Sequence, residues 1–117
     1  MAAALAVATG GLAATQIASA RPAATTLSLS ADSSGKLKFN KTSLSAKAGK
    51  VTLKMANPSN LPHAVGVSGK GVDKDGKTVR KGGTSTVTLT LKKGKYSFYC
   101  PVDGHKAAGM KGTLTVN

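Results

Sequence analysis

The sequence predicts an all-β domain, a sandwich of about seven or eight short strands. Beyond about residue 36, apolar and polar residues alternate with a period of two almost throughout, as in half-buried strands of antiparallel sheets. Turn-forming pairs that contain glycine, proline or asparagine separate these runs, and no window shows the period of an amphipathic helix. Because aromatic residues are few, we expect a modest core of valine, leucine and alanine.

The N-terminal 35 residues are expected to precede the main domain. Residues 1–20 carry no charge, are rich in alanine and end in Ala18-Ser19-Ala20, a small-residue cleavage site. They are interpreted as a signal peptide, and the alternative is a transmembrane anchor. Residues 21–35 are interpreted as a leader, although the alternation over 26–30 is compatible with a first strand. The domain itself is assigned to residues 36–117.

Each expected strand has a face of apolar side chains at every second position. In chain order these faces comprise Leu37 and Phe39; Val51, Leu53 and Met55; His63, Val65 and Val67; Val87, Leu89 and Leu91; Tyr96, Phe98 and Cys100; and Leu114 and Val116. Residues 73–76 superficially resemble a calcium loop, but they lack a third acidic ligand and the distal glutamate, so they are predicted to form a turn.

The charge is strongly positive. The chain carries 17 basic and 4 acidic residues, a net charge of +13, all of it beyond residue 20. Such a field favours acidic partners or anionic surfaces. Nucleic acid is not the expected partner. The lysines are scattered, there are only two arginines and few aromatic residues, and the chain carries an expected export signal. Most of these charges are expected to form a solubilising coat.

Three potential metal ligands fall within eleven residues, in the pattern Cys100-x₄-His105-x₄-Met110. Cys100 is the only cysteine, so no internal disulfide can form. It is expected to end a strand on the core face, and the chain then loops back into the last strand. The remaining histidine, His63, is expected to begin another strand and to point to the same core face.

A thiolate, two imidazoles and a thioether are typical of copper, and a weak methionine contact on a His₂Cys plane describes a blue-copper electron-transfer site. Each residue also has a simpler interpretation. Cys100 could be a structural thiol, His105 a loop residue, His63 a core histidine and Met110 a core side chain. Together they predict one copper ion, held by His63, Cys100, His105 and Met110, in a one-electron carrier that is not an enzyme. The alternative is a copper-delivery protein of the cell envelope, although the chain has no methionine- or histidine-rich tract.

Two parts of the sequence resemble plastocyanins and related cupredoxins. Their copper loop is similar to residues 96–100, Gly104-His105, Ala108-Gly109-Met110 and 112–116, and their first-ligand motif is similar to Pro62-His63. The resemblance implies a two-sheet Greek-key sandwich with copper near one end. The gap between Cys100 and His105 is longer than in plastocyanin and matches azurin and rusticyanin. Ala64 stands where many members carry an asparagine that ties the ligand loops together.

The resemblance also implies that His105 reaches the surface through an apolar patch, here Leu61, Pro62, Pro101, Val102, Ala107 and Ala108. Tyr99 resembles a second electron-exit residue, and the alternative is an ordinary cross-strand aromatic. Pro101 has no N–H, so the Val102 amide is the expected donor to the cysteine sulfur.

Lys106 and Lys111 are expected to steer an acidic redox partner toward the metal. The protein is expected to be an exported monomer, in the periplasm, outside the cell or in the envelope. Association with an anionic membrane or envelope surface is a further expectation from the charge.

Overall fold

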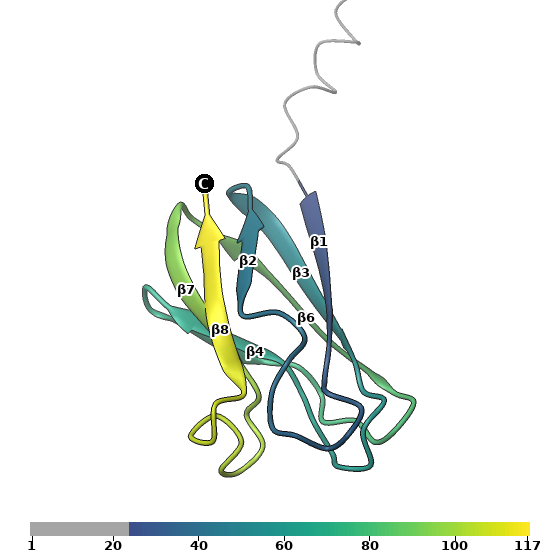
Figure 1. Cartoon of the computed structure of the whole chain (residues 1–117). Coiled ribbons are helices and arrows are strands. Elements are labelled where there is room, and N and C mark those ends of the chain that lie inside the picture. The colour runs from purple at the N-terminus through teal and green to yellow at the C-terminus, as the bar shows by residue number, and fades with distance from the viewer. Residues whose placement is uncertain (1–23) are drawn as a thin grey trace, which may run out of the picture.

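The computed structural model describes residues 24–117, which form eight strands and no helix (Figure 1). The all-β prediction is confirmed, and the export signal predicted over residues 1–20 lies outside the described part of the chain. The strands are β1 (Ala24–Ser30), β2 (Ser43–Ala46), β3 (Gly49–Ala56), β4 (Gly66–Gly69), β5 (Val72–Asp75), β6 (Thr84–Leu91), β7 (Gly94–Tyr99) and β8 (Lys111–Val116).

The strands form two sheets, one of three strands in the order β1-β3-β6 and one of five in the order β2-β8-β7-β4-β5. The pairs β1–β3 and β2–β8 are parallel, and the others are antiparallel. Because sequence neighbours are often not sheet neighbours, the chain crosses between the sheets, as in the expected Greek key. The core between the sheets contains the fully buried Val51, Leu53, Met55, Val67, Phe98 and Leu114.

The structure extends the sandwich N-terminally to Ala24, into the segment interpreted as a leader in which residues 26–30 were compatible with a first strand. All seven residues of β1 pair in parallel with β3, from Ala24 beside Lys50 to Ser30 beside Ala56. Leu29 is buried, and Leu27 packs against the core. The pairing joins segments about 25 positions apart, so the short alternating run alone could not reveal it.

The strand expected around Leu37 and Phe39 is absent from the structure, where that segment is an irregular connection with one isolated bridge, between Ala31 and Phe39. The carboxylate of Asp32 accepts hydrogen bonds from the backbone amides of Ser34 and Lys36, which turns the chain here. Phe39 is nevertheless buried, and its ring centroid lies 5.7 Å from that of Phe98. The alternation therefore reflected burial without a strand.

The turn predicted at residues 73–76 is also wrong, because Val72–Asp75 is strand β5, paired with β4. The turn lies just before it, at Lys70 and Gly71, whose φ angles are 49° and 82°. Two consecutive positive φ values are typical of the two-residue hairpin turns that suit twisted strands. β5 is an exposed edge strand, so it lacks the buried alternation that the sequence analysis relied on.

Both sheets end at the side of the molecule where residues 57–65 and 100–110, which include the expected metal ligands, connect the strands (Figure 1). The opposite end holds the β2–β3 and β6–β7 connections and the chain's C-terminus. Within residues 24–117, no helix is long and apolar enough to cross a membrane.

Candidate metal centre

Three ligating atoms converge at one end of the sandwich. The Nδ1 atoms of His63 and His105 lie 3.2 Å apart, and the Sγ atom of Cys100 lies 3.9 Å from the first and 3.5 Å from the second. A divalent ion such as zinc binds nitrogen at about 2.0–2.1 Å and thiolate sulfur at about 2.3 Å. Every measured separation is below the sum of two such distances, so one ion can reach all three atoms.

Cys100 follows directly after β7 and is fully buried. Its backbone amide donates to the carbonyl of Met110 at 3.0 Å, which closes the loop between them. The backbone amide of Ala64 lies 3.5 Å from the sulfur and is the donor to it, in place of the Val102 amide that the sequence suggested. Val102 instead accepts, through its carbonyl, a hydrogen bond from the amide of His105.

The loop between Cys100 and Met110 is built from successive backbone turns. The amide of Ala108 donates to the carbonyl of Gly104, and the amide of Gly109 donates to that of Lys106. Gly104 and Gly109 have φ values of 80° and 115°, in the region that favours glycine. The turns therefore fix the backbone around His105, whose Nδ1 lies 3.5 Å from the cysteine sulfur.

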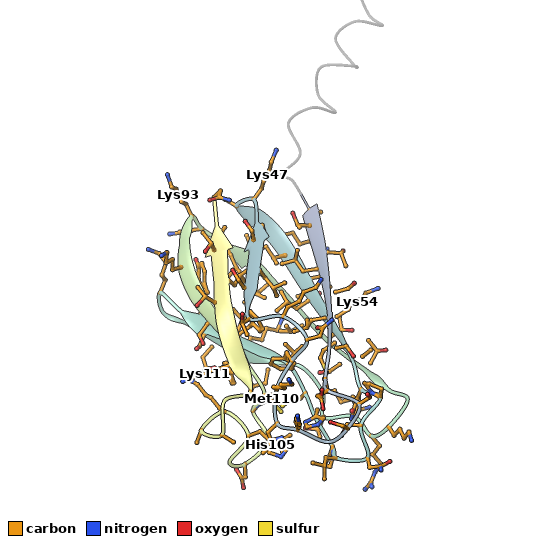
Figure 2. All side chains as sticks on the ribbon, in the orientation of Figure 1. Lys47, Lys54, Lys93, His105, Met110 and Lys111 are labelled. Carbon is orange, nitrogen blue, oxygen red and sulfur yellow. The ribbon has the colours of Figure 1, made fainter. Side chains whose placement is uncertain are left out.

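Met110 is fully buried and is tied to two of the ligand residues through its backbone. Its amide donates to the carbonyl of His105 at 3.1 Å, and its carbonyl accepts from the amide of Cys100 at 3.0 Å. Met110 and His105 lie at the same end of the molecule in Figure 2. The thioether is thus a fixed, buried side chain available as the fourth, weak ligand.

The sequence predicted that His63 begins a strand. In the structure it lies three residues before β4, which begins at Gly66. It forms an isolated bridge with Val79, with hydrogen bonds in both directions at 3.1 and 2.8 Å. Its side chain is fully buried. This bridge fixes the first ligand against the loop between β5 and β6.

Asn57 is a supporting residue that the sequence does not reveal, because an Asn-Pro pair such as Asn57-Pro58 is typical of an ordinary turn. The side chain is 1% exposed. Its Nδ2 donates to the carbonyls of Leu61 and Val79 at 2.9 Å each, and its Oδ1 accepts from the amide of Ser59 at 2.9 Å. Asn57 therefore braces the loop that leads to the first histidine.

Burial, with a smaller contribution from the charge of His105, lowers the pKa of His63. The side chain is accordingly neutral near pH 7, which leaves a lone pair on a ring nitrogen for a metal. Its Nε2 atom is buried and has no hydrogen-bond partner among the described residues. The Nδ1 atom, in contrast, faces the other two ligating atoms.

The residues of the predicted apolar patch surround the metal-binding end. His105 is half-buried, and Leu61 is 40% exposed. Pro62, Ala107 and Ala108 are exposed, whereas Pro101 and Val102 are partly buried. The edge of His105 is therefore the ligand surface nearest to solvent.

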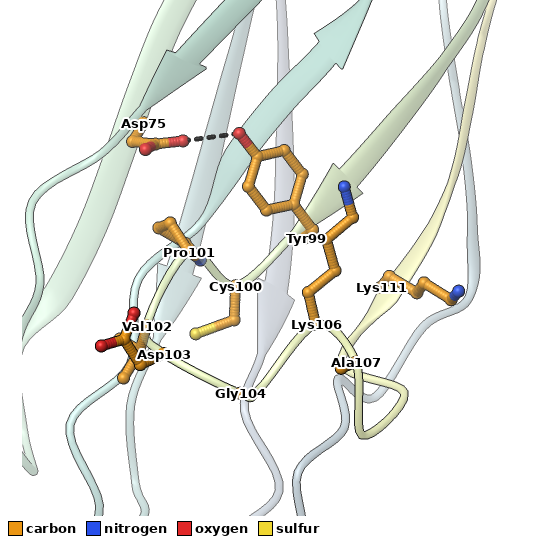
Figure 3. A pocket seen from close by; sticks show the side chains of 10 residues that line it. All are labelled: Asp75, Tyr99, Cys100, Pro101, Val102, Asp103, Gly104, Lys106, Ala107 and Lys111. Carbon is orange, nitrogen blue, oxygen red and sulfur yellow. Dashed lines mark hydrogen bonds between the residues drawn. The ribbon is translucent and has the colours of Figure 1, made fainter.

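Tyr99 is largely covered, with 7% of its side chain exposed. Its hydroxyl lies 2.6 Å from a carboxylate oxygen of Asp73 and 2.7 Å from one of Asp75, and the Nζ atom of Lys106 lies 4.5 Å from the ring centroid. Burial, and then these carboxylates, raise the pKa of Tyr99. Tyr99 lines an open pocket of about 580 Å³. Figure 3 shows its side chain between Asp75 and the loop that carries Lys106. Lys111, also exposed, lines the same pocket.

Residues 25–117 match the family of copper-binding proteins described as the plastocyanin/azurin family. The chain belongs to this family. It is 38% identical over 93 residues to plastocyanin A/B of Petroselinum crispum, an alignment that covers 71% of this chain and 91% of that protein. The resemblance to cupredoxins is thereby confirmed.

Solved structures agree with this assignment. Auracyanin B superimposes with a TM-score of 0.71 and 27% identity, covering 83% of this chain and 91% of that one. Auracyanin A, a "blue" copper protein of Chloroflexus aurantiacus, gives 0.67 and 25%, covering 81% and 100%. The blue copper oxidase of Nitrosomonas europaea shares the fold, with a TM-score of 0.66 and 22% identity, covering 81% of this chain and 39% of that protein.

The family and the geometry lead to the same cofactor. His63, Cys100, His105 and Met110 are arranged as a type 1 copper site, in which a thiolate and two imidazoles form the strong set and a buried thioether the weak one. Copper is therefore the cofactor of this protein, as the sequence predicted.

Proposed function

We propose that this protein is an exported one-electron carrier that exchanges electrons between redox partners. The observation that carries the proposal is the buried cluster of His63, Cys100 and His105, in which only His105 is partly exposed. Copper bound there would supply a one-electron redox couple. The family membership supports the same function.

The chain's own residues perform the remaining tasks. Burial excludes water from Cys100 and His63, and the Ala64 amide holds the sulfur in place. The half-buried His105 lies among small and apolar side chains, so a partner can approach the ligand closely. A small apolar contact favours weak and brief binding, which a shuttle requires.

Copper delivery is the alternative function. A delivery protein must release its metal, and exposed ligands on mobile loops would serve that purpose. Here Cys100, His63 and Met110 are fully buried, and backbone hydrogen bonds close the loop on both sides of His105. This closed arrangement favours a retained ion.

An enzymatic role would need further copper centres. Both histidines of the chain already belong to the cluster, so none remains for a second centre within it. The blue copper oxidase of Nitrosomonas europaea shares the fold at 22% identity, and this chain covers 39% of it. We therefore propose a carrier without catalytic activity of its own.

Export, partners and oligomeric state complete the proposal. The uncharged N-terminal segment with its Ala18-Ser19-Ala20 site supports export to the periplasm, the exterior or the envelope. The net charge of +13 supports an acidic redox protein as partner, with Lys106 and Lys111 near the metal as the steering charges. We propose a monomer that does not bind nucleic acid.

Copper titration with visible spectroscopy tests the function. We expect one copper(II) per chain and an intense blue band that requires the Cys100 thiolate. Cys100→Ser should lose the band and keep the circular dichroism spectrum of a folded sandwich. A blue serine variant would refute the ligand assignment.

The retention of copper separates the two functions. A carrier should keep its ion in the presence of a competing chelator and should still reduce a soluble oxidant in a single one-electron step. Rapid transfer of the copper to the chelator, without a strong blue band, would support delivery instead.

A further inference from the structure

The end of the sandwich away from the metal carries a cluster of exposed lysines and none of the chain's aspartates. We call it the distal basic end, and it comprises Lys47, Lys50, Lys70, Lys92, Lys93 and Lys95. The four acidic residues lie elsewhere: Asp32 follows β1, Asp73 and Asp75 contact Tyr99, and Asp103 belongs to the copper loop. The charged side chains at this end are therefore of one sign, and the negative group beside them is the C-terminal carboxylate of Asn117, whose residue is hydrogen-bonded to Ala48 (Figure 1).

Backbone pairing brings these lysines together from connections that are distant in the sequence. Gly49 pairs with Leu91, which places the β2–β3 connection beside the β6–β7 connection. Gly94 pairs with Val116 at the start of β7. Lys70, in the β4–β5 turn, lies against Gly94, where an added Cβ would fall 2.5 Å from its Cδ atom.

The distal basic end and the copper site lie at opposite ends of the strands. Figure 2 shows Lys47 and Lys93 at one end and His105 and Met110 at the other. The eight residues of β3 run between the two ends. At about 3.3 Å per residue they span roughly 25 Å.

We propose that the distal basic end docks on an anionic membrane surface, with the copper site facing away from the bilayer. Lysines close to an anionic leaflet are attracted to it additively, and a cluster of four to eight is typical of proteins that bind acidic lipids. No side-chain carboxylate at this end opposes that attraction, and the C-terminal carboxylate of Asn117 offsets only one of the six lysine charges.

The composition of the distal basic end favours lipid headgroups over an acidic protein. The cores of protein–protein interfaces are enriched in aromatic residues, methionine and arginine and depleted in lysine. The large hydrophobic residue exposed in the described part of the chain is Leu61, which lies in the loop next to the copper site. The distal basic end thus offers charge without the apolar anchors that a specific protein contact uses.

The position of the N-terminal segment supports the same orientation. The strand that follows residues 1–23 in the sequence begins at the distal basic end, since Ala24, the first residue of β1, pairs with Lys50. Residues 1–20 are uncharged and largely apolar. A bilayer that held residues 1–20 would therefore lie next to the distal basic end. The proposal goes beyond electron transfer and leaves the copper end open to partners in solution.

Sedimentation of the full chain with vesicles tests the proposal. The vesicles contain phosphatidylcholine with about 30% phosphatidylglycerol, a fraction chosen to give a clearly anionic surface, and pure phosphatidylcholine vesicles serve as the neutral reference. The test variant is Lys47→Gln/Lys92→Gln/Lys93→Gln. Its matched control is Lys77→Gln/Arg80→Gln/Lys81→Gln, which loses the same charge around Val79, beside His63.

We expect the wild type and the matched control to bind the anionic vesicles equally well. The affinity of the test variant should fall by about fivefold per lysine, on the order of a hundredfold for three. Equal losses in both variants would mean that only net charge matters, and equal sedimentation of the wild type with neutral vesicles would mean that the lysines do not matter. Either result overturns the proposal, as does binding to soluble polyglutamate without binding to vesicles.

Lysine acetylation read by mass spectrometry tests the orientation. Anionic vesicles should protect Lys47, Lys92 and Lys93 and leave Lys106 and Lys111 as reactive as in solution. Protection of the latter pair instead would place the copper end on the membrane and refute the orientation. Neither experiment involves copper, so a negative result leaves the proposed electron transfer intact.

Discussion

Asn57 and His63 meet at one atom, the carbonyl oxygen of Val79. This oxygen accepts a hydrogen bond from Asn57 Nδ2 at 2.9 Å and another from the backbone amide of His63 at 3.1 Å. The same amide group of Asn57 also donates to the carbonyl of Leu61. One buried asparagine thus fixes both the loop before the first copper ligand and the strand-like segment that pairs with it.

Asn57→Ala should therefore destabilise the protein and disturb the copper site together. The change leaves the amide of Ser59 and the carbonyl of Leu61 without their partners, each costing about 1–3 kcal/mol where it stays buried. We expect a loss of about 2 kcal/mol or more in urea unfolding of the copper-free protein. The copper-loaded variant should show a shifted blue band, because His63 is no longer held in place.

Asn60→Ala is the matched control, since Asn60 lies in the same loop but is exposed. Its free energy of unfolding should stay within about 0.5 kcal/mol of the wild type. Its blue band should not move. If Asn57→Ala behaves like this control in both measurements, the asparagine does not position the ligand.

The role of Asn57 shows which parts of the site the sequence could reveal. Cysteine, histidine and methionine side chains bind soft metals directly, so their spacing was enough to predict the set His63, Cys100, His105 and Met110. Asn57 acts only through backbone groups of other residues, and an Asn-Pro pair is equally typical of an ordinary turn. Nothing in its local sequence distinguishes the two roles.

The donor to the cysteine sulfur escaped prediction for a related reason. The Ala64 amide reaches Cys100 across 36 positions of sequence, and a backbone group leaves no residue-type signal. From the sequence alone, only near neighbours of Cys100 can be considered as donors, and these favour the Val102 amide. Contacts of this kind depend on the packing of two loops, which the three-dimensional fold alone defines.

The same distinction holds for the fold. The buried strands β3, β7 and β8 were predicted by their alternation, because one face of each packs into the core. β5 was missed because it is an exposed edge strand with no buried face. The β1–β3 pairing joins distant segments in parallel and has no hairpin signal between them.

Met110→Leu should retain the blue colour and raise the reduction potential. Met110 is fully buried, and a leucine of similar volume should cost less than about 1.5 kcal/mol in stability. The potential should rise because the cuprous form depends less on a fourth ligand. Spectroelectrochemical titration of the variant and the wild type measures the shift.

Met55→Leu provides the control, because Met55 is equally buried but lies in β3 within the core. Its potential should match the wild type. A colourless Met110→Leu protein, or one with a lowered potential, would contradict the weak-ligand role.

The raised pKa of Tyr99 predicts a loss of stability at alkaline pH. In the unfolded chain the phenol ionises near pH 10. In the folded protein, burial and the carboxylates of Asp73 and Asp75 keep it neutral to higher pH. The stabilising contribution is thus complete below about pH 10 and declines as the pH rises above it, by at most about 1.4 kcal/mol per pH unit.

Urea unfolding of the copper-free protein between pH 9 and 11 measures this decline. Tyr99→Phe should make the fall of the unfolding free energy with pH less steep, because the phenol that causes it is gone. Tyr96→Phe serves as the control, because it deletes a phenol that bonds to the Lys92 carbonyl and leaves Tyr99 in place. Identical slopes for the wild type and Tyr99→Phe would show that the tyrosine does not contribute.

Lys111 offers the sharper test of electrostatic steering at the copper end. Lys106 was predicted to take part as well, but its Nζ atom lies over the Tyr99 ring, so Lys106→Glu would also remove a cation–π contact. Lys111 is exposed and directly follows Met110. Lys111→Glu should keep the blue colour and react more slowly than the wild type with a negatively charged electron donor at low salt, because the attraction that brings the donor to this end is weakened.

Lys93→Glu is the control, because it changes the net charge equally at the distal basic end. Stopped-flow rates over a range of salt concentrations compare the two variants. At 0.1 M salt the Debye length is about 10 Å, shorter than the distance of roughly 20 Å or more that the strands place between Lys93 and the copper site. Lys93→Glu should then stay close to the wild type while Lys111→Glu remains slow, and all three rates should converge near 1 M, where the Debye length is about 3 Å. If the two variants are slowed equally at every ionic strength, the donor responds to net charge alone, and Lys111 belongs to the solubilising coat.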